Sequence, residues 1–205
     1  MEVKLADELS TKIFHHLNQI YNNQDNEKLT NKIISIFFKN HDPIYPNPNV
    51  SKWDQQDMIL ITYANSILEK EKVPLQSLYK FLENYIAPYI NSVHILPYFP
   101  FSSDDGFAVI DFKKINDAYG AWEDIEVIAN KYKLMTDLVI NHTSARSRWF
   151  DQFKNCKNPG QNYYLSIKPN TDIKDVVRPR TSSLLQEVDT LEGKKYVWST
   201  FSHDQ

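Results

Sequence analysis

The chain has 205 residues, enough for one domain with an appended segment, and 41% apolar with 13% aromatic residues can bury a sizeable core. Its net charge of −3 excludes the basic surface typical of nucleic-acid binding, and Cys156, the only cysteine, excludes an internal disulfide. The polar N-terminus and the lack of an apolar run of about 20 residues indicate no signal peptide and no membrane span, so we expect a cytoplasmic protein.

Two helices are predicted near the N-terminus. Apolar residues recur at helical spacing over residues 4–22, and residues 27–39 repeat the pattern. Residues 40–52 are rich in proline and asparagine, which is typical of a loop. We therefore assign residues 1–52 to a helical extension and expect its apolar stripes to pack outside the segment that follows.

Strands and helices alternate over residues 53–155. The predicted strands are short apolar runs, typical of buried strands, at residues 58–63, 93–99 and 134–142. Helical spacing occurs between them, at residues 74–90 and 119–133. This order predicts parallel βαβ units in an α/β fold.

The pattern changes after the third predicted strand. Residues 143–155 have the pattern of a helix, and most of residues 156–205 are polar with short apolar stretches. A strand is predicted at residues 194–201. We interpret this part as an insertion packed on one end of the sheet.

Polar and aromatic residues follow each predicted strand. Tyr63 ends the first strand, Asp104 and Asp105 follow the second, and Asn141 and His142 end the third. Ligands of parallel α/β folds bind at the carboxyl ends of the strands, so these side chains are expected on one rim. Carboxylates accept hydrogen bonds from hydroxyls and aromatic rings cover sugar rings, whereas no glycine-rich phosphate cradle is present. The combination favours a sugar ligand.

Each residue taken alone also has a structural explanation. Asp104 and Asp105 precede a glycine, as turn residues often do, and His142 has the character of a satisfied core histidine. Asp137 lies inside the third predicted strand, where a carboxylate must be paired. The residues by themselves therefore predict a polar rim and do not specify a reaction.

Seven segments, taken in order, resemble the sucrose phosphorylase-like branch of glycoside hydrolase family 13, the α-amylase superfamily. They are MILITYANSI, HILPYFPFSSDDGFAVIDF, GAWEDI, DLVINH, NHTSARSRWFDQF, VVRPRTSSLL and VWSTFSHDQ. DLVINH matches the Asp-x-x-x-Asn-His region of that family. The resemblance covers residues 53–205. It implies a partial (β/α)8 TIM barrel, with the first three strands and helices at 53–155 and an inserted B domain at 156–205.

The resemblance also implies roles for individual residues. Asp104 matches the aspartate that holds the glucosyl unit, Phe107 the apolar platform beside it, and His142 the histidine that hydrogen-bonds the donor glucose. Arg178 and Arg180 match an Arg-Pro-Arg loop near the acceptor or phosphate, which suits the guanidinium fork. The residues expected only to shape the rim are Tyr63, Asp105, Asp137 and Asn141.

The chemistry of the family requires residues that this sequence does not show. A retaining double displacement uses two carboxylates about 5–5.5 Å apart, and the nucleophile is expected after a fourth strand in an Arg-x-Asp pattern. The sequence contains no Arg-x-Asp. We therefore assign no catalytic residue, expect the N-terminal part of a larger enzyme that is inactive alone, and expect a C-terminal half as a partner. No cofactor or metal is predicted.

Three functional hypotheses stay open. The first is part of a sucrose or glucosylglycerate phosphorylase, with an α-glucoside and phosphate as substrates. The second keeps the family but makes the whole protein a hydrolase or transglucosidase. The third is a non-catalytic remnant that binds only sugar or a partner chain.

Overall fold

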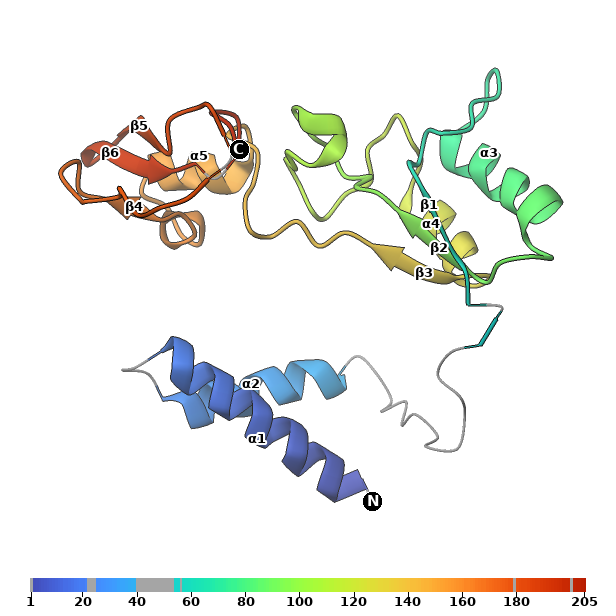
Figure 1. Cartoon of the computed structure of the whole chain (residues 1–205), viewed down its shortest axis with the longest axis horizontal. Coiled ribbons are helices and arrows are strands. Elements are labelled where there is room, and N and C mark those ends of the chain that lie inside the picture. Colours follow the sequence, from blue (N-terminus) through green and yellow to red (C-terminus); the bar gives the residue numbers. More distant parts are fainter. Residues whose placement is uncertain (1, 22–24, 40–53, 56, 179, 200) are drawn as a thin grey trace. The chain divides into compact units, whose positions relative to one another are not determined.

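The computed structural model describes residues 2–21, 25–39, 54–55, 57–178, 180–199 and 201–205. The chain divides into two units, residues 1–52 and 53–205 (Figure 1).

The first unit contains the two predicted helices, α1 (Glu2–Ile20) and α2 (Asn26–Lys39). Asp25 precedes α2 and its carboxylate accepts a hydrogen bond from the Lys28 N–H at 3.0 Å, as expected of a helix cap. The Asn26 amide donates to Asn18 Oδ1 at 2.7 Å and to the Tyr21 carbonyl at 2.9 Å, which joins the two helices. Packing of this unit against the rest of the chain stays a prediction.

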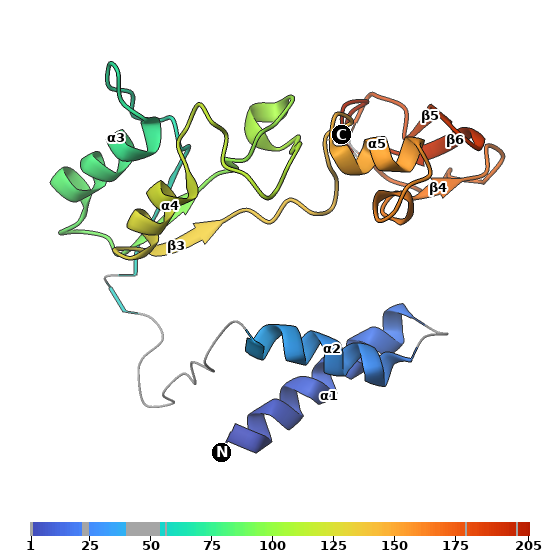
Figure 2. The ribbon, with the colours of Figure 1, turned by 180° about the vertical axis from the view of Figure 1, so that it is seen from behind.

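The second unit begins with the three predicted parallel strands. They are β1 (Ile59–Thr62), β2 (Ser92–Ile95) and β3 (Lys133–Thr136), and they pair in the order β1-β2-β3 (Figures 1 and 2). The helices between them are α3 (Pro74–Phe81), which continues as a π-helical turn over Leu82–Ile86, and α4 (Trp122–Ala129). The predicted alternation and parallel order are confirmed.

One face of this sheet carries the core. Val93 and Ile95 of β2 are fully buried and belong to the same apolar cluster as Leu75 and Leu78 of α3 and Ile128 of α4. These five side chains come from elements adjacent in sequence, so the core of the βαβ units is built from local segments.

The other face of the sheet is exposed. Ile59 and Ile61 of β1 are 45% and 61% exposed, and Met135 of β3 is 47% exposed. Ile61, His94 and Met135 are register partners, so they form one row across the sheet. The prediction that residues 58–63 are a buried strand is therefore wrong for alternate residues, because the described residues leave this face uncovered.

The second and third strands are shorter than predicted. β2 ends before Pro97, which has no N–H to donate to a neighbouring strand. β3 ends at Thr136 rather than residue 142, and the Ile140 N–H turns back to the Leu138 carbonyl at 3.0 Å. Asp137 and the residues after it therefore lie in irregular chain beyond the sheet.

The segment after residue 142 forms a helix and a small antiparallel sheet. The helix α5 (Arg148–Lys154) begins later than predicted because the Ser147 hydroxyl caps it, accepting from the Phe150 N–H at 3.1 Å. The sheet has the order β4-β6-β5, with strands β4 (Ser166–Ile167), β5 (Leu185–Thr190) and β6 (Gly193–Trp198). The strand predicted at 194–201 corresponds to β6, whereas β4 and β5 were not predicted. That this part is an inserted B domain stays an interpretation.

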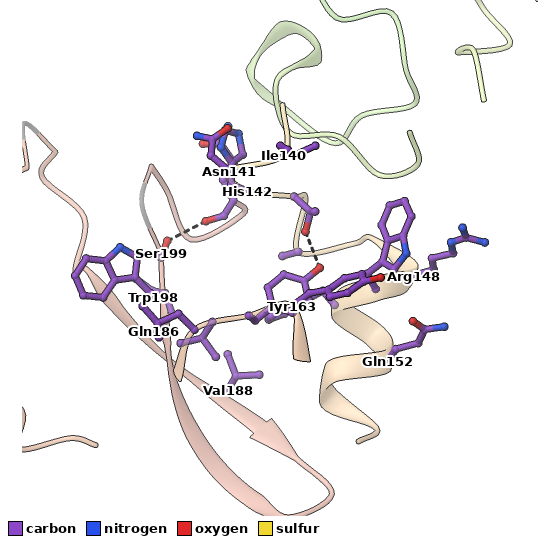
Figure 3. A pocket seen from close by; sticks show the side chains of 18 of the residues that line it. Ile140, Asn141, His142, Arg148, Gln152, Tyr163, Gln186, Val188, Trp198 and Ser199 are labelled. Atoms are coloured by element: carbon purple, nitrogen blue, oxygen red, sulfur yellow. Dashed lines mark hydrogen bonds between the residues drawn. The ribbon is translucent and has the colours of Figure 1, made fainter. Parts of the chain in front are cut away.

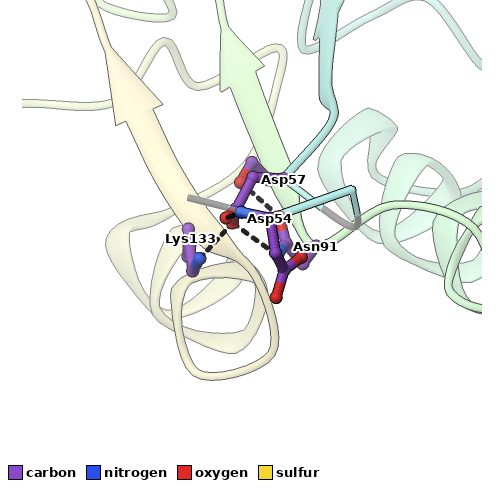
Figure 4. Close-up of polar contacts among 5 residues, drawn as sticks. Asp54, Asp57, Asn91 and Lys133 are labelled. Atoms are coloured by element: carbon purple, nitrogen blue, oxygen red, sulfur yellow. Dashed lines mark hydrogen bonds and ion pairs between the residues drawn. The ribbon is translucent and has the colours of Figure 1, made fainter. Parts of the chain in front are cut away.

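Asp57 joins the amino ends of the three parallel strands (Figure 4). Its carboxylate accepts hydrogen bonds from the Asn91 amide at 2.8 Å, from the Asp54 N–H at 2.7 Å and from the Lys133 ammonium. Asn91 precedes β2 and Lys133 begins β3. The bond from Lys133, then those from Asn91 and Asp54, lowers the pKa of Asp57 to about 2.

The loop after β2 has an unusual backbone. Asp104, Asp105 and Gly106 have positive φ angles of 60°, 48° and 110° and form one 3₁₀ turn. A Cβ atom at Gly106 would lie 2.6 Å from the Pro97 carbonyl oxygen. Only glycine fits both this φ angle and this close approach to Pro97, so Gly106 fixes the conformation of the loop that carries Asp104.

We expect Asp57→Asn to lower the Tm at pH 7 by several degrees, because an amide cannot form the ion pair with Lys133. The folded-state pKa of Asp57 is depressed from 3.8 to about 2, so its stabilisation is fully present above pH 3.8 and is lost as the pH falls through about 2. Thermal unfolding from pH 7 to pH 2.5 should show the difference from wild type shrinking below pH 3.8. Asp117→Asn, at an exposed position, is the control. A difference that does not change with pH would contradict the assignment.

We expect Gly106→Ala to destabilise the chain more than Gly193→Ala. Gly193 has a φ angle of 106°, but nothing lies within 4 Å of a Cβ added there. Gly193→Ala should therefore cost about 1–2 kcal/mol for the left-handed backbone alone. Gly106→Ala should cost about 1–3 kcal/mol more, because the Pro97 carbonyl must also move. Urea unfolding of both variants measures the difference, and equal losses would rule out the steric contact.

Candidate functional site

A cavity of about 370 Å³ lies beyond the carboxyl ends of the parallel strands. It brings together six of the nine residues singled out from the sequence: Asp104, Phe107, Asp137, Asn141, His142 and Arg180. Leu138, Val139 and Phe201 complete the lining. Tyr63, Asp105 and Arg178 do not line it. We call this space the donor cavity, after the donor glucose that the resemblance described above would place there.

Asp104 presents an exposed carboxylate at the edge of the donor cavity. One carboxylate oxygen accepts a hydrogen bond from the Gln205 amide at 2.8 Å. Since a carboxylate has about four acceptor positions, the remaining positions can accept hydrogen bonds from the hydroxyls of a ligand. Asp105 is also exposed but lies outside the cavity.

His142 is held in one tautomer by the loop after β2. Its Nε2–H donates to the Phe107 carbonyl at 3.0 Å, so Nδ1 of the neutral ring is an acceptor. Within the described part of the chain, this buried Nδ1 has no hydrogen-bond partner. Burial lowers the pKa of His142, against the opposing effects of the Phe107 carbonyl and the Asp104 charge, so the ring is neutral at pH 7.

The two arginines of the Arg-Pro-Arg sequence have different environments. The Arg178 guanidinium donates to the Ser182 carbonyl at 2.8 Å and to the Ser182 hydroxyl at 2.9 Å. These bonds join the two ends of the loop that contains both arginines. The Arg180 guanidinium lies 5.2 Å from the centre of the Phe201 ring and faces the donor cavity. Phe201 in turn lies against His142, with ring centres 4.6 Å apart. Only Arg180 is therefore placed to contact a ligand.

The other predicted rim residues have local partners. Asp137 accepts a hydrogen bond from His94 at 2.9 Å, which links the row formed by Ile61, His94 and Met135 to the cavity. The Tyr63 N–H donates to the Ser66 hydroxyl at 3.1 Å. Asn141 is exposed and lines the cavity.

Three residues near the end of the sequence were not predicted from the sequence. Phe201 and Gln205 make the contacts described above, and Asp204 accepts hydrogen bonds from the hydroxyls of Ser102 at 2.6 Å and Ser103 at 2.8 Å. Burial raises the pKa of Asp204, but the two serine bonds and the charges of Arg146 and His203 hold it below its ordinary value. No periodicity or motif in this segment indicates these contacts.

A larger cavity of about 1140 Å³ adjoins the donor cavity (Figure 3). It is lined by α5 and by residues of β5 and β6, and it shares Asn141 and His142 with the donor cavity. Trp149, Tyr163 and Trp198 contribute aromatic rings to its wall. The site thus combines a small cavity that carries the Asp104, His142 and Arg180 side chains with a larger one that has several aromatic rings.

The described residues contain no group of three or more His, Cys, Asp or Glu side chains arranged to hold a metal ion. Within the same residues, no helix has the length and apolar character needed to cross a membrane.

Comparison with known proteins places these features in a family. The catalytic domain of the α-amylase family matches residues 84–198, more than half of the chain. The glucosylglycerate phosphorylase of Spirochaeta thermophila is 41% identical over 152 residues, which are 74% of this chain and 26% of that protein. The sucrose phosphorylase of Streptococcus mutans is 30% identical over 158 residues, 72% of this chain and 32% of that protein.

A solved structure agrees with these matches. The crystal structure of sucrose 6F-phosphate phosphorylase from Thermoanaerobacter thermosaccharolyticum superposes with a TM-score of 0.62 at 29% identity, covering 74% of this chain and 32% of that one. The chain thus spans 26% to 32% of the length of these relatives. The chain belongs to the α-amylase family, in the branch that contains the glucosylglycerate and sucrose phosphorylases.

Proposed function

We propose that the chain supplies the glucosyl-binding part of a phosphorylase that cleaves an α-glucoside, such as sucrose or glucosylglycerate, and transfers glucose to phosphate. One observation carries the proposal: a carboxylate, an imidazole and a guanidinium, from Asp104, His142 and Arg180, surround a single cavity at the strand ends. The names of the relatives, glucosylglycerate phosphorylase and sucrose phosphorylase, support the same reaction.

The donor cavity has the groups that a glucosyl ring requires. The carboxylate of Asp104 accepts hydrogen bonds from ring hydroxyls. His142 lines the same cavity beside Asp104, and its ring is held in place by the bond from Nε2–H to the Phe107 carbonyl. The phenyl rings of Phe107 and Phe201 cover the apolar side of the sugar.

Arg180 is the residue we assign to the anionic group of the second substrate. The Arg180 guanidinium lies over the Phe201 ring, and its N–H groups suit phosphate or the carboxylate of glycerate. Arg178 holds the same loop through Ser182. We therefore propose a direct role for Arg180 and a supporting role for Arg178.

The covalent chemistry needs groups that we do not assign to this chain. Double displacement requires one carboxylate at the anomeric carbon and a second as acid and base. The carboxylates lining the donor cavity, Asp104 and Asp137, are bonded to Gln205 and His94, and the sequence has no Arg-x-Asp. We propose that further polypeptide supplies both catalytic carboxylates, and that residues 1–205 alone bind sugar without turning it over.

The exposed face of the parallel sheet is the surface we assign to that further polypeptide. In a closed barrel the inward residues of the strands pack in layers, and we assign Ile59, Ile61 and Met135, which are exposed in this chain, to such positions. Completing the barrel would cover them.

The alternatives predict different outcomes in one assay. A non-catalytic sugar-binding module would form no product, and a hydrolase or transglucosidase would use water or a sugar in place of phosphate. Residues 1–205, together with the further polypeptide that supplies the catalytic carboxylates, are incubated with sucrose or glucosylglycerate, with and without phosphate. Formation of glucose 1-phosphate supports the proposed phosphorylase. Free glucose or transfer products formed without phosphate support a hydrolase or transglucosidase, and the absence of any product supports a non-catalytic module.

We expect residues 1–205 to bind D-glucose and Asp104→Asn to weaken that binding. Loss of charge-assisted hydrogen bonds to hydroxyls should raise the Kd about ten-fold or more. Asp105→Asn is the matched control, because Asp105 shares the left-handed backbone but lies outside the cavity, and its Kd should stay at the wild-type value. Titration calorimetry measures both. If residues 1–205 catalysed phosphorolysis and Asp104→Ala abolished it, the chemistry would reside in this chain. That result would contradict the proposal that residues 1–205 bind sugar without turning it over.

We also expect residues 1–205 alone to associate at increasing concentration, because an apolar sheet face is exposed. Ile61→Ser combined with Met135→Ser should reduce the association. Leu191→Ser is the control, since Leu191 is equally apolar and 74% exposed but lies in the β5–β6 turn. Sedimentation velocity over a concentration series is the measurement, and a concentration-independent monomer would contradict the expectation.

A further inference from the structure

Asp204 connects the end of the sequence to the loop after β2. Its Oδ2 accepts hydrogen bonds from the hydroxyls of Ser102 and Ser103 at 2.6 and 2.8 Å. Ser103 directly precedes Asp104 in the chain. The Asp204 carboxylate therefore bonds the two residues that lead into the aspartate of the donor cavity.

Asp204 also connects to the segment that follows His142. Its carbonyl accepts a hydrogen bond from the Ala145 N–H at 2.8 Å. The hydroxyl of Ser144, which is fully buried, lies 2.6 Å from the Ser102 hydroxyl, and the Ser144 N–H donates to the Val109 carbonyl at 2.8 Å. One residue thus contacts both loops that carry the sugar-binding side chains.

We infer that Asp204 is a positioning residue that sets the spacing of Asp104 and His142 by bonding the loops after β2 and β3 to one residue. Asp204 lines neither the donor cavity nor the larger cavity, so it acts through its neighbours and not on the ligand. The inference deepens the proposed function and depends on it for the identity of the ligand, but the geometry of the loops can be tested without any ligand.

The chemistry of the contact explains why a carboxylate is suited to this position. Serine hydroxyls donate one hydrogen bond each, and a single carboxylate oxygen has lone pairs for both donors. Hydrogen bonds to an ionised acceptor are shorter and about twice as strong as neutral ones. An asparagine placed here keeps the size of the side chain but loses the charge and turns one acceptor into a donor.

Hydrogen exchange tests the inference on residues 1–205. Asp204→Asn should raise the amide exchange rates of residues 102–109 and 143–147 by about ten-fold, the effect expected when charge-assisted hydrogen bonds are lost. The control is Asp189→Asn, at an exposed position in β5, which should leave both segments at wild-type rates. Unchanged exchange of both segments in Asp204→Asn would overturn the inference.

A mutant cycle separates positioning from general destabilisation. Ser103→Ala should raise exchange in the same two segments, and adding it to Asp204→Ala should produce little further change, because both substitutions remove the bond from the Ser103 hydroxyl to the Asp204 carboxylate. Fully additive effects would overturn the inference. Where Asp204→Asn does not fold, Ser103→Ala and Ser102→Ala provide the same comparison with smaller changes.

Glucose affinity links the inference to function. Asp204→Asn and Ser103→Ala should each raise the Kd for D-glucose by about five-fold, although neither residue lines the cavity. An unchanged Kd in both variants would overturn the role of Asp204 in binding. If the wild-type chain does not bind glucose, the proposed function fails, and the exchange rates still decide whether Asp204 positions the loops.

Discussion

Parallel pairing of β1, β2 and β3 is the constraint on which the site depends. In-register parallel strands begin at one edge of the sheet and end at the other, so the segments that follow them emerge together. The bonds of Asp57 to Asn91 and Lys133 hold the amino edge. This order brings Asp104 and His142, which follow different strands, to the same end of the sheet.

Beyond the strand ends the chain is irregular, and polar contacts replace the ladder of the sheet. His142 bonds the Phe107 carbonyl, Ser144 bonds the Val109 carbonyl, and Asp204 bonds two serines. Each contact joins segments that are distant in sequence. The precision of the site therefore depends on a few hydrogen bonds between loops, whereas the stability of the sheet depends on apolar burial by α3 and α4.

The alternation of apolar runs and helical spacing was sufficient to predict the parallel sheet, because each βαβ unit is local in sequence. Sequence also placed Asp104 and His142 on one rim, since strand ends and their order determine the rim. It could not separate Arg178 from Arg180, which share a motif. Their difference arises from the bonds of Arg178 to Ser182.

The contacts of Asp204 and Gln205 lay outside prediction for a different reason. Their partners are about a hundred residues earlier in the chain, and no local pattern marks such pairs. β5 escaped prediction because its less exposed positions include Gln186 and Thr190 beside Val188, so the alternation of apolar and polar residues that marks a strand is weak.

The one-sided core has a consequence for synthesis on the ribosome. Val93, Ile95 and Ile128 are fully buried by neighbours that all precede residue 140 in the chain, so the helix-facing layer can form as soon as these segments have left the exit tunnel. The opposite face, with Ile61 and Met135, stays exposed in the described part of the chain. A nascent chain with its helix-facing layer packed would therefore still expose an apolar sheet face, and chaperones recognise such surfaces.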